Sequence, residues 1–223
     1  MNLRRVLVLP LSALLVTPLW AGVSVIGTVQ TSKFATLRGA NLVSGTTVCD
    51  GDDISVLSQG SAWISLPGGS AVLIGQNSEM LFQKSSKSGA VFEIESGQAK
   101  FRSSGASPVR AILGDATIEP LKGAAVGYIT MYGQTSAIIG AEKGDIQITL
   151  AQDGSSKTIH EGSAIAVRLV PDSQQEDDSK VVSGIKRRRR IIFWGAAIVG
   201  TATFIGILLN DDEKPESPTN FQK

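Results

Sequence analysis

The sequence of 223 residues contains a single histidine, His160, and therefore offers few ways to build a catalytic or metal site. A zinc site with two histidine ligands cannot be made from one histidine. Serines for a Ser-His-Asp triad are abundant, but no G-x-S-x-G signature accompanies them. The setting Thr-Ile-His-Glu-Gly is typical of a strand end that enters a turn. The sequence therefore favours a surface or hydrogen-bonded histidine over a catalytic one.

Three aspartates, Asp50, Asp52 and Asp53, surround Gly51 and invite comparison with a calcium-binding loop. Their spacing does not match the EF-hand pattern D-x-[DN]-x-[DN]-G with a later glutamate. Aspartates also favour tight turns, because their side chains bond to nearby backbone N–H groups. We therefore predict a turn here, and we predict no metal ligand and no cofactor in the chain.

Glu93 and Glu95 would lie on one face of a strand about 6.5–7 Å apart, near the separation of the carboxylates in an inverting glycosidase. Two glutamates at this spacing usually form the solvated face of an amphipathic strand, and no other motif supports glycosidase chemistry. We predict no catalytic residue and expect the chain not to be an enzyme, with a glycan-acting enzyme or a peptidase as the third-ranked alternative.

Three aromatic residues, Trp63, Tyr128 and Tyr132, could contact a partner. Trp63 alternates with Ala62, Ile64 and Leu66, a pattern that would turn it outward. Packing in the core or between sheets remains the favoured interpretation for all three. Cys49 is the only cysteine, so it cannot form an internal disulfide. We predict that it serves as a small, buried or half-buried apolar residue.

The body of the chain alternates apolar and polar residues with a period of two, which predicts half-buried strands. No window before residue 191 has helical periodicity, so the predicted class is all-β. Glycines recur nine residues apart, at 51, 60 and 69 and again at 105, 114 and 123. This spacing fits either solenoid-like rungs or a sandwich with turns every 8–12 residues. The alternating apolar sets are Ala90, Phe92 and Ile94; Ala99 and Phe101; Ile146, Ile148 and Leu150; and Ile165, Val167 and Leu169.

The two ends of the chain are hydrophobic. A basic head at Arg4 and Arg5, an apolar run and a small residue at Ala21 predict a secretory signal peptide. The 19 uncharged residues Ile191–Leu209 would form a helix about 28 Å long, which matches a bilayer core of about 30 Å. The predicted organisation is a signal peptide (1–21), a β-domain (22–170), a flexible linker (171–186), a transmembrane helix with its basic flank (187–210) and a short polar tail (211–223).

The signal peptide and the charges next to the span predict opposite orientations. A signal peptide places the β-domain outside the cytoplasm, in the periplasm, whereas the positive-inside tendency would keep the basic flank in the cytoplasm. We favour the signal peptide, because the first segment usually sets orientation. On the outer side the flank would face anionic lipid headgroups. The flank consists of Lys186, Arg187, Arg188, Arg189 and Arg190.

Charge and small residues suggest which partners to expect. The stretch Gly22–Ile185 holds 12 Lys and Arg against 16 Asp and Glu, so its net charge is 12 − 16 = −4, which argues against nucleic acid as a partner. In the span, Ala196 and Gly200 are four residues apart, as are Ala202 and Gly206. Small residues at this spacing let two helices approach closely, so we expect at most a weak homodimer through the span.

The stretch LRGANLVSGTTVCDGDDISVLSQGSAWISLPGGSAVLIGQNSEMLF (Leu37 to Phe82) resembles the periplasmic FecR-type domain. That family has a small-Gly-x-x-Leu-x-x-Gly opening, a Gly-Asp-x-Ile step, and an alternating strand that runs into a Gly-Ser turn. Later phrases around Gly97, Gly144 and Gly162 resemble the second half of the domain. The matching positions are Gly39, Leu42, Gly45, Gly51, Asp52, Ile54, Gly69 and Ser70.

The resemblance implies a binding or sensing module of the cell envelope, with a protein or an envelope polymer as its partner. Regulatory members of the family also carry a cytoplasmic region that binds a sigma factor. Here five residues precede the apolar run and 14 follow Leu209, which is too few for such a domain. The leading hypothesis is a membrane-tethered, non-enzymatic binding or sensing module. The alternative is a structural or assembly protein that oligomerises through its β-domain or its span.

Overall fold

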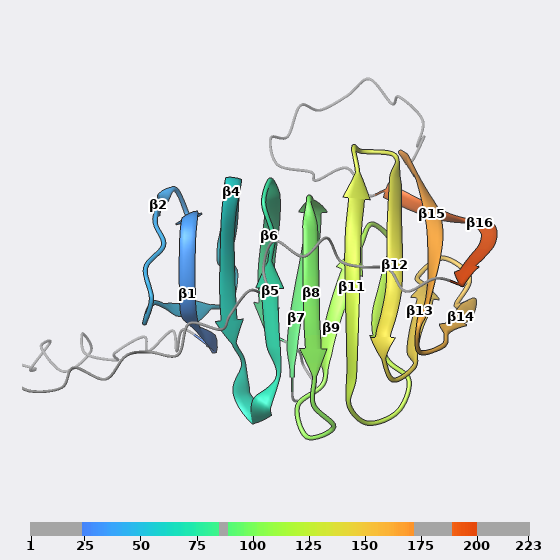
Figure 1. Cartoon of the computed structure of the whole chain (residues 1–223), viewed down its shortest axis with the longest axis horizontal. Coiled ribbons are helices and arrows are strands. Elements are labelled where there is room, and N and C mark those ends of the chain that lie inside the picture. Colours follow the sequence, from blue (N-terminus) through green and yellow to red (C-terminus); the bar gives the residue numbers. More distant parts are fainter. Residues whose placement is uncertain (1–23, 85–88, 172–188, 200–223) are drawn as a thin grey trace, which may run out of the picture.

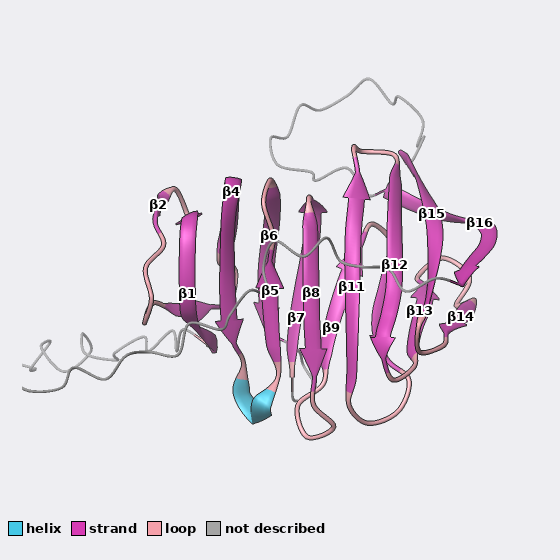
Figure 2. Cartoon of the chain, in the orientation of Figure 1, coloured by secondary structure: helices cyan, strands magenta, loops and turns pink. Residues whose placement is uncertain are grey.

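The computed structural model of the chain describes residues 24–84, 89–171 and 189–199. Strands dominate these residues, and the one helical element among them is the short 3₁₀ turn η1 (Pro67–Gly69) (Figure 2). The 16 strands found in these ranges belong to one sheet, which confirms the all-β class. Among the described residues no helix is both long and apolar enough to cross a membrane.

The sheet curls back on itself, so that two layers face each other. The first layer runs in the order β14 (Ser156–Ile159), β13 (Ile146–Leu150), β10 (Ala116–Pro120), β9 (Val109–Leu113), β7 (Ala90–Ser96) and β6 (Ser78–Lys84). The second layer runs in the order β5 (Ala71–Ile74), β8 (Gln98–Ser103), β11 (Ala125–Tyr132), β12 (Ser136–Lys143), β15 (Ser163–Pro171) and β16 (Arg189–Val199). In Figure 1, β8 and β11 stand in front of β7 and β9.

The long strand β4 (Asp53–Ser65) joins the two layers. Its first residues, Asp53–Val56, pair with β6, and its last, Ala62–Ser65, pair with β5. The equally long β1 (Val25–Leu37) pairs with β4 on both sides of the bend between these two halves. The short strands β2 (Ala40–Asn41) and β3 (Thr47–Cys49) pair with the far edge of β1.

The core lies between the two layers and comes from the alternating positions that the sequence predicted. Ala90, Phe92 and Ile94 of β7 are buried, as are the predicted apolar sets of β8 and β15. Three phenylalanines link the layers. The ring centroid of Phe92 lies 6.3 Å from that of Phe82 and 5.9 Å from that of Phe101, the second pair meeting edge to face. Such geometry suits the quadrupoles of aromatic rings.

The glycine spacing does not mark solenoid rungs. Neighbouring strands are antiparallel except for the parallel pair of β7 and β9, so the chain meanders and crosses over instead of winding in stacked turns. Gly60, which the nine-residue spacing predicted to be a turn, lies inside β4. A Cβ atom there would meet the carbonyl oxygens of Lys33 and Phe34 at 2.7 and 2.8 Å. Gly60 is therefore needed for the close approach of β1 and β4 at the bend.

The C-terminal hydrophobic segment also differs from the prediction. Residues 189–199 form β16, antiparallel to β15, where the sequence predicted the basic flank and the first half of a helix. Ile, Val and aromatic residues favour extended structure. In this strand Ile191 points into the core and Ile192 points outward. The signal peptide, most of the linker, Lys186–Arg188, the second half of the span (200–209) and the tail lie outside the described residues.

Candidate binding surface

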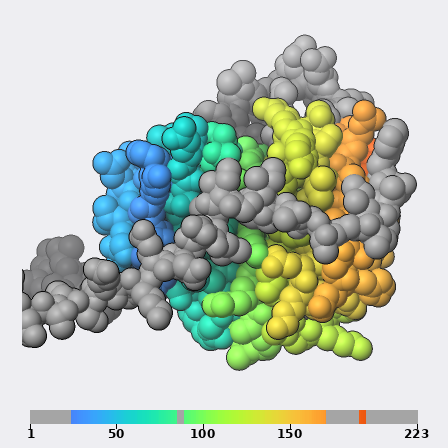
Figure 3. Space-filling model, viewed as in Figure 1, coloured from blue at the N-terminus to red at the C-terminus, as the bar shows by residue number. Residues whose placement is uncertain are grey.

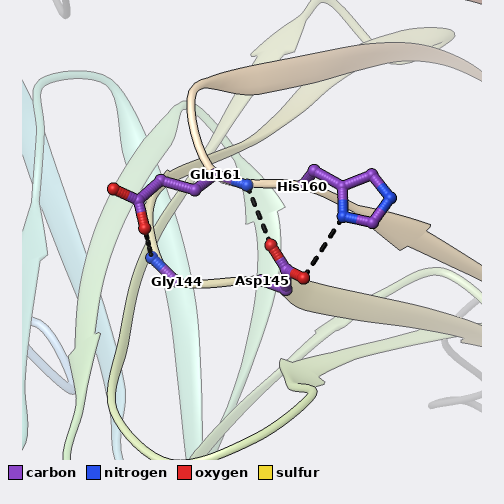
Figure 4. A network of polar contacts seen from close by, with 4 residues as sticks. All are labelled: Gly144, Asp145, His160 and Glu161. Carbon is purple, nitrogen blue, oxygen red and sulfur yellow. Dashed lines mark hydrogen bonds and ion pairs between the residues drawn. The ribbon is translucent and has the colours of Figure 1, made fainter.

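His160 belongs to a small polar network that ties two neighbouring turns together (Figure 4). Its Nδ1 lies 3.2 Å from Oδ2 of Asp145, whose Oδ1 accepts a hydrogen bond of 3.0 Å from the backbone N–H of Glu161. The side chain of Glu161 accepts in return a bond of 2.8 Å from the backbone N–H of Gly144. The network joins the turn before β13 to the turn before β15.

The pKa of Asp145 is lowered, first by the bond from the Glu161 backbone and then by the bond to His160. The side chain of His160 is 76% exposed, so water reaches the ring freely. A histidine that acts as a general base is usually held within hydrogen-bond reach of the substrate in a pocket that excludes water, unlike this exposed ring. The geometry fits the surface histidine that the sequence favoured, with a role in holding the two turns.

The acidic turn is an anchoring point of the fold. The buried carboxylate of Asp52 accepts a bond of 2.7 Å from the backbone N–H of Cys49 and lies 2.7 Å from the guanidinium of Arg38. Oδ1 of Asp50 accepts a bond of 2.9 Å from the N–H of Lys84. Within the described ranges no group of three or more His, Cys, Asp or Glu residues could hold a metal ion. The Asp52–Cys49 bond is a local contact of the predicted turn, and the bond from Lys84 to Asp50 ties that turn to the end of β6.

The family-motif residues occupy turns, the core and one buried hydrogen-bond network. Ser70 is buried at the end of η1, and its hydroxyl accepts a bond of 2.9 Å from the N–H of Ser104 and donates to the carbonyl of Ser107. Leu42 and Ile54 are buried in the core. Four glycines of the motif adopt positive φ: Gly39, Gly45, Gly51 and Gly69. The buried motif positions therefore contribute to the core and to this network, while the motif glycines lie in exposed turns.

Large apolar side chains are exposed where β1 and β4 bend. Phe34 is 57% exposed and Leu57 is 58% exposed. The register pairs Lys33 with Ser61 and Ala35 with Val56 and shifts between these two pairs. Phe34 of β1 and Leu57 of β4 both lie in this interruption, each next to the buried Ala35–Val56 pair along its own strand. We call Lys33, Phe34 and Leu57 the bend patch. Its strands, blue to cyan in Figure 3, lie at the opposite end of the molecule from β15 and β16.

The backbone beneath the bend patch is strained. Phe34 has a φ of 48° and Gln59 a φ of 60°. Residues other than glycine rarely adopt such positive φ values. Each such residue costs about 1–3 kcal/mol and persists only where the surroundings impose it. Here the irregular register of β1 and the close passage of Gly60 impose it. An exposed phenylalanine thus sits on a backbone of unfavourable φ, which makes the bend patch a candidate binding surface.

The three aromatic residues weighed from the sequence have different environments. Trp63 is 41% exposed and Tyr132 is 59% exposed, so the favoured core packing is wrong for both. Tyr128 is buried, but on the outer side of the second layer, where its ring lies over Gly140 of β12. Burial is the main cause of its raised pKa, and the charge of Glu142 adds to it. Strand alternation alone did not reveal Phe34 or Leu57, because a bulge changes which face a residue occupies.

The chain matches no protein-family model and no curated protein. Among solved structures it resembles two crystal structures, at 2.50 and 1.65 Å resolution, of a protein described as a "putative anti-sigma factor from Parabacteroides distasonis ATCC 8503". The identity is 18%, the TM-scores are 0.43 and 0.44, and the match covers 52% of this chain and 54% of that one. This chain thus spans about half the length of the solved protein, and a similarity of this size identifies neither a partner nor an activity.

Proposed function

We propose that this chain is a non-enzymatic binding module that engages a protein partner through the bend patch. The observation that carries the proposal is the exposure of two large apolar side chains, Phe34 and Leu57, at one interruption of the β1–β4 pairing, where Phe34 has a positive φ. Large exposed aromatic and aliphatic groups are the usual anchors of protein interfaces. A fold with no use for these groups would gain stability by turning them inward or by relaxing the bulge.

The chemistry of the patch suggests the kind of surface that would cover it. Full burial of a phenylalanine or leucine side chain contributes about 1.5–3 kcal/mol, so two half-exposed side chains could together contribute a few kcal/mol to binding. The ammonium of Lys33 lies 5.4 Å from the ring centroid of Phe34. A cation beside an apolar anchor favours a partner with an apolar pocket and a carboxylate at its rim.

The sequence supports a place for this module in the cell envelope. The predicted signal peptide would export the β-domain, and the uncharged run Ile191–Leu209 would anchor it in a bilayer. In this proposal the bend patch faces the periplasm, at the end of the sheet remote from the anchored segment. The stretch from Leu37 to Phe82 resembles the FecR-type domain, which fits a sensing role of this kind.

The test is affinity isolation from an envelope extract with the full chain as bait. The double variant Phe34→Ser with Leu57→Ser removes the exposed apolar groups, while Tyr132→Ser removes an equally exposed aromatic residue on β11. The wild type and Tyr132→Ser should retain the same partner, and the double variant should retain about tenfold less of it. Circular dichroism should show that all three share one fold.

Equal recovery of the partner by the double variant would refute the bend patch as the binding surface. Recovery of the chain's own second copy as the main product would instead favour the assembly alternative. Light scattering of the purified chain separates the two, because a recruiter has a defined small stoichiometry and an assembly protein is polydisperse.

A further inference from the structure

The strand β16 is attached to the rest of the sheet along one edge only. It is last in the strand order and pairs with β15, whose other edge pairs with β12. Figure 1 shows β16 at the end of the sheet beyond β15. If β16 left the sheet, the backbone N–H and C=O groups along the outer edge of β15 would lose their partners. Such an edge readily accepts another extended chain.

The seat that β16 occupies recognises an extended segment through two side chains and one backbone group. Ile191 is buried in the core, and its N–H donates a bond of 2.8 Å to Oδ1 of Asp115, in the turn between β9 and β10. Two residues on, the ring of Phe193 packs against the core, with the ammonium of Lys157 5.5 Å from its centroid. A segment with apolar residues at two alternate positions would satisfy this seat.

The pairing of β16 with β15 is interrupted. Five consecutive pairs run from Pro171–Arg189 to Val167–Phe193, and three more run from Ile165–Ala197 to Ser163–Val199. Between them, two steps along β15 correspond to four steps along β16. Each interruption leaves ladder groups unpaired, so β16 is held less firmly than a strand in continuous register.

The same residues begin the uncharged run Ile191–Leu209, which has the length of a membrane helix. A segment cannot be strand and membrane helix at once, so insertion in a bilayer would withdraw β16 from the sheet. We infer that β16 is an exchangeable strand, and that its withdrawal opens the edge of β15 to an extended segment of a partner protein with apolar residues at alternate positions. This inference rests on the membrane anchor of the proposed function.

Disulfide trapping in the full chain tests the exchange. On a Cys49→Ser background, Arg168→Cys with Ile192→Cys places cysteines at paired positions of β15 and β16. Arg168→Cys with Ser136→Cys does the same for β15 and β12 and serves as the matched control. Paired residues of antiparallel strands have Cα atoms about 4.5–5.5 Å apart, within the range for a disulfide.

Each variant is oxidised after refolding without lipid and after reconstitution into vesicles of phosphatidylethanolamine and phosphatidylglycerol. The control pair should cross-link equally in both settings, while the β15–β16 pair should cross-link about tenfold less in vesicles. Flotation of the vesicles reports the anchor separately. A chain that does not float refutes the anchor and the exchange together, whereas a chain that floats and cross-links fully refutes the exchange alone.

The open edge is then probed with a synthetic peptide of residues 187–199 of this chain. It should bind the reduced, vesicle-bound protein at least about tenfold more tightly than a peptide carrying Ile191→Asp and Phe193→Asp. Protein locked by the β15–β16 disulfide before reconstitution should not bind it. Equal binding of the two peptides, or binding to the locked protein, would overturn the edge of β15 as the site.

Discussion

Substitution of Asp52 by alanine separates a structural acidic turn from a calcium site. Asp52 is buried, accepts a bond of 2.7 Å from the backbone N–H of Cys49, and pairs with Arg38 at 2.7 Å. The loss of a hydrogen bond to a charged group costs about 1.5–3 kcal/mol. The guanidinium of Arg38 is largely in solvent, so that ion pair adds only about 0–1 kcal/mol.

We therefore expect Asp52→Ala to lower the free energy of unfolding by about 2–3 kcal/mol and the melting temperature by about 5–10 °C. The neighbouring Asp53 has an exposed side chain at the start of β4. Its replacement by alanine is the matched control and should cost less than about 0.5 kcal/mol. The free energies of unfolding of the two variants are measured by urea unfolding of the full chain in a mild detergent, with tryptophan fluorescence as the signal.

The measurement is repeated with calcium and with EDTA. If the turn is structural, neither addition changes the unfolding midpoint of the wild type or of either variant. A midpoint that rises with calcium in the wild type but not in Asp52→Ala would refute the structural account. Equal destabilisation by the two alanine variants would refute the assignment of the stabilising contact to Asp52.

Three further outcomes follow from the structure. Gly140→Ala places a Cβ 2.2 Å from the Tyr128 ring, so it should cost about 1–3 kcal/mol, and Tyr128→Ala should relieve most of that cost in a double-mutant cycle of thermal melts. Asp145 has a lowered pKa, so the stability it contributes is present above its unfolded pKa of about 3.9 and is lost as the pH falls through the lower folded value. Wild type should therefore exceed Asp145→Asn in stability at neutral pH, and the difference should shrink in acid; a gap that persists there contradicts the assignment. An alkaline phosphatase fusion after Lys180 should be active and a GFP fusion there dark, and the reverse pair of results would favour the positive-inside orientation.

The alternation of apolar residues was enough to predict the all-β class and most of the core. Phe92 and Ile94, Ala99 and Phe101, and Val167 are buried where the period of two placed them. The reason is that a residue's face is set locally wherever a strand is regular. The same local logic made the turn at Asp52 predictable, because an aspartate beside a glycine has few other favourable conformations.

The bend patch and β16 were not predictable in this way, because both depend on distant parts of the chain. Phe34 is exposed because β1 bulges against β4 at Gly60, a contact between residues 26 positions apart. Residues 189–199 carry a composition that suits a strand or a membrane helix, and only the presence of β15 provides an edge for the strand. The local pattern of apolar residues does not show whether this segment pairs with another strand or enters a bilayer.

Site-specific photo-cross-linking in living cells tests the binding role of the bend patch most directly. A photoreactive phenylalanine analogue replaces Phe34 in the full-length chain, and in a second strain it replaces the equally exposed Tyr132. We expect a discrete adduct of one partner from position 34 after irradiation, and none from position 132. Adducts of the same partner in the same yield at both positions would contradict this role. So would the absence of an adduct at position 34 when a position on another face of the sheet gives one.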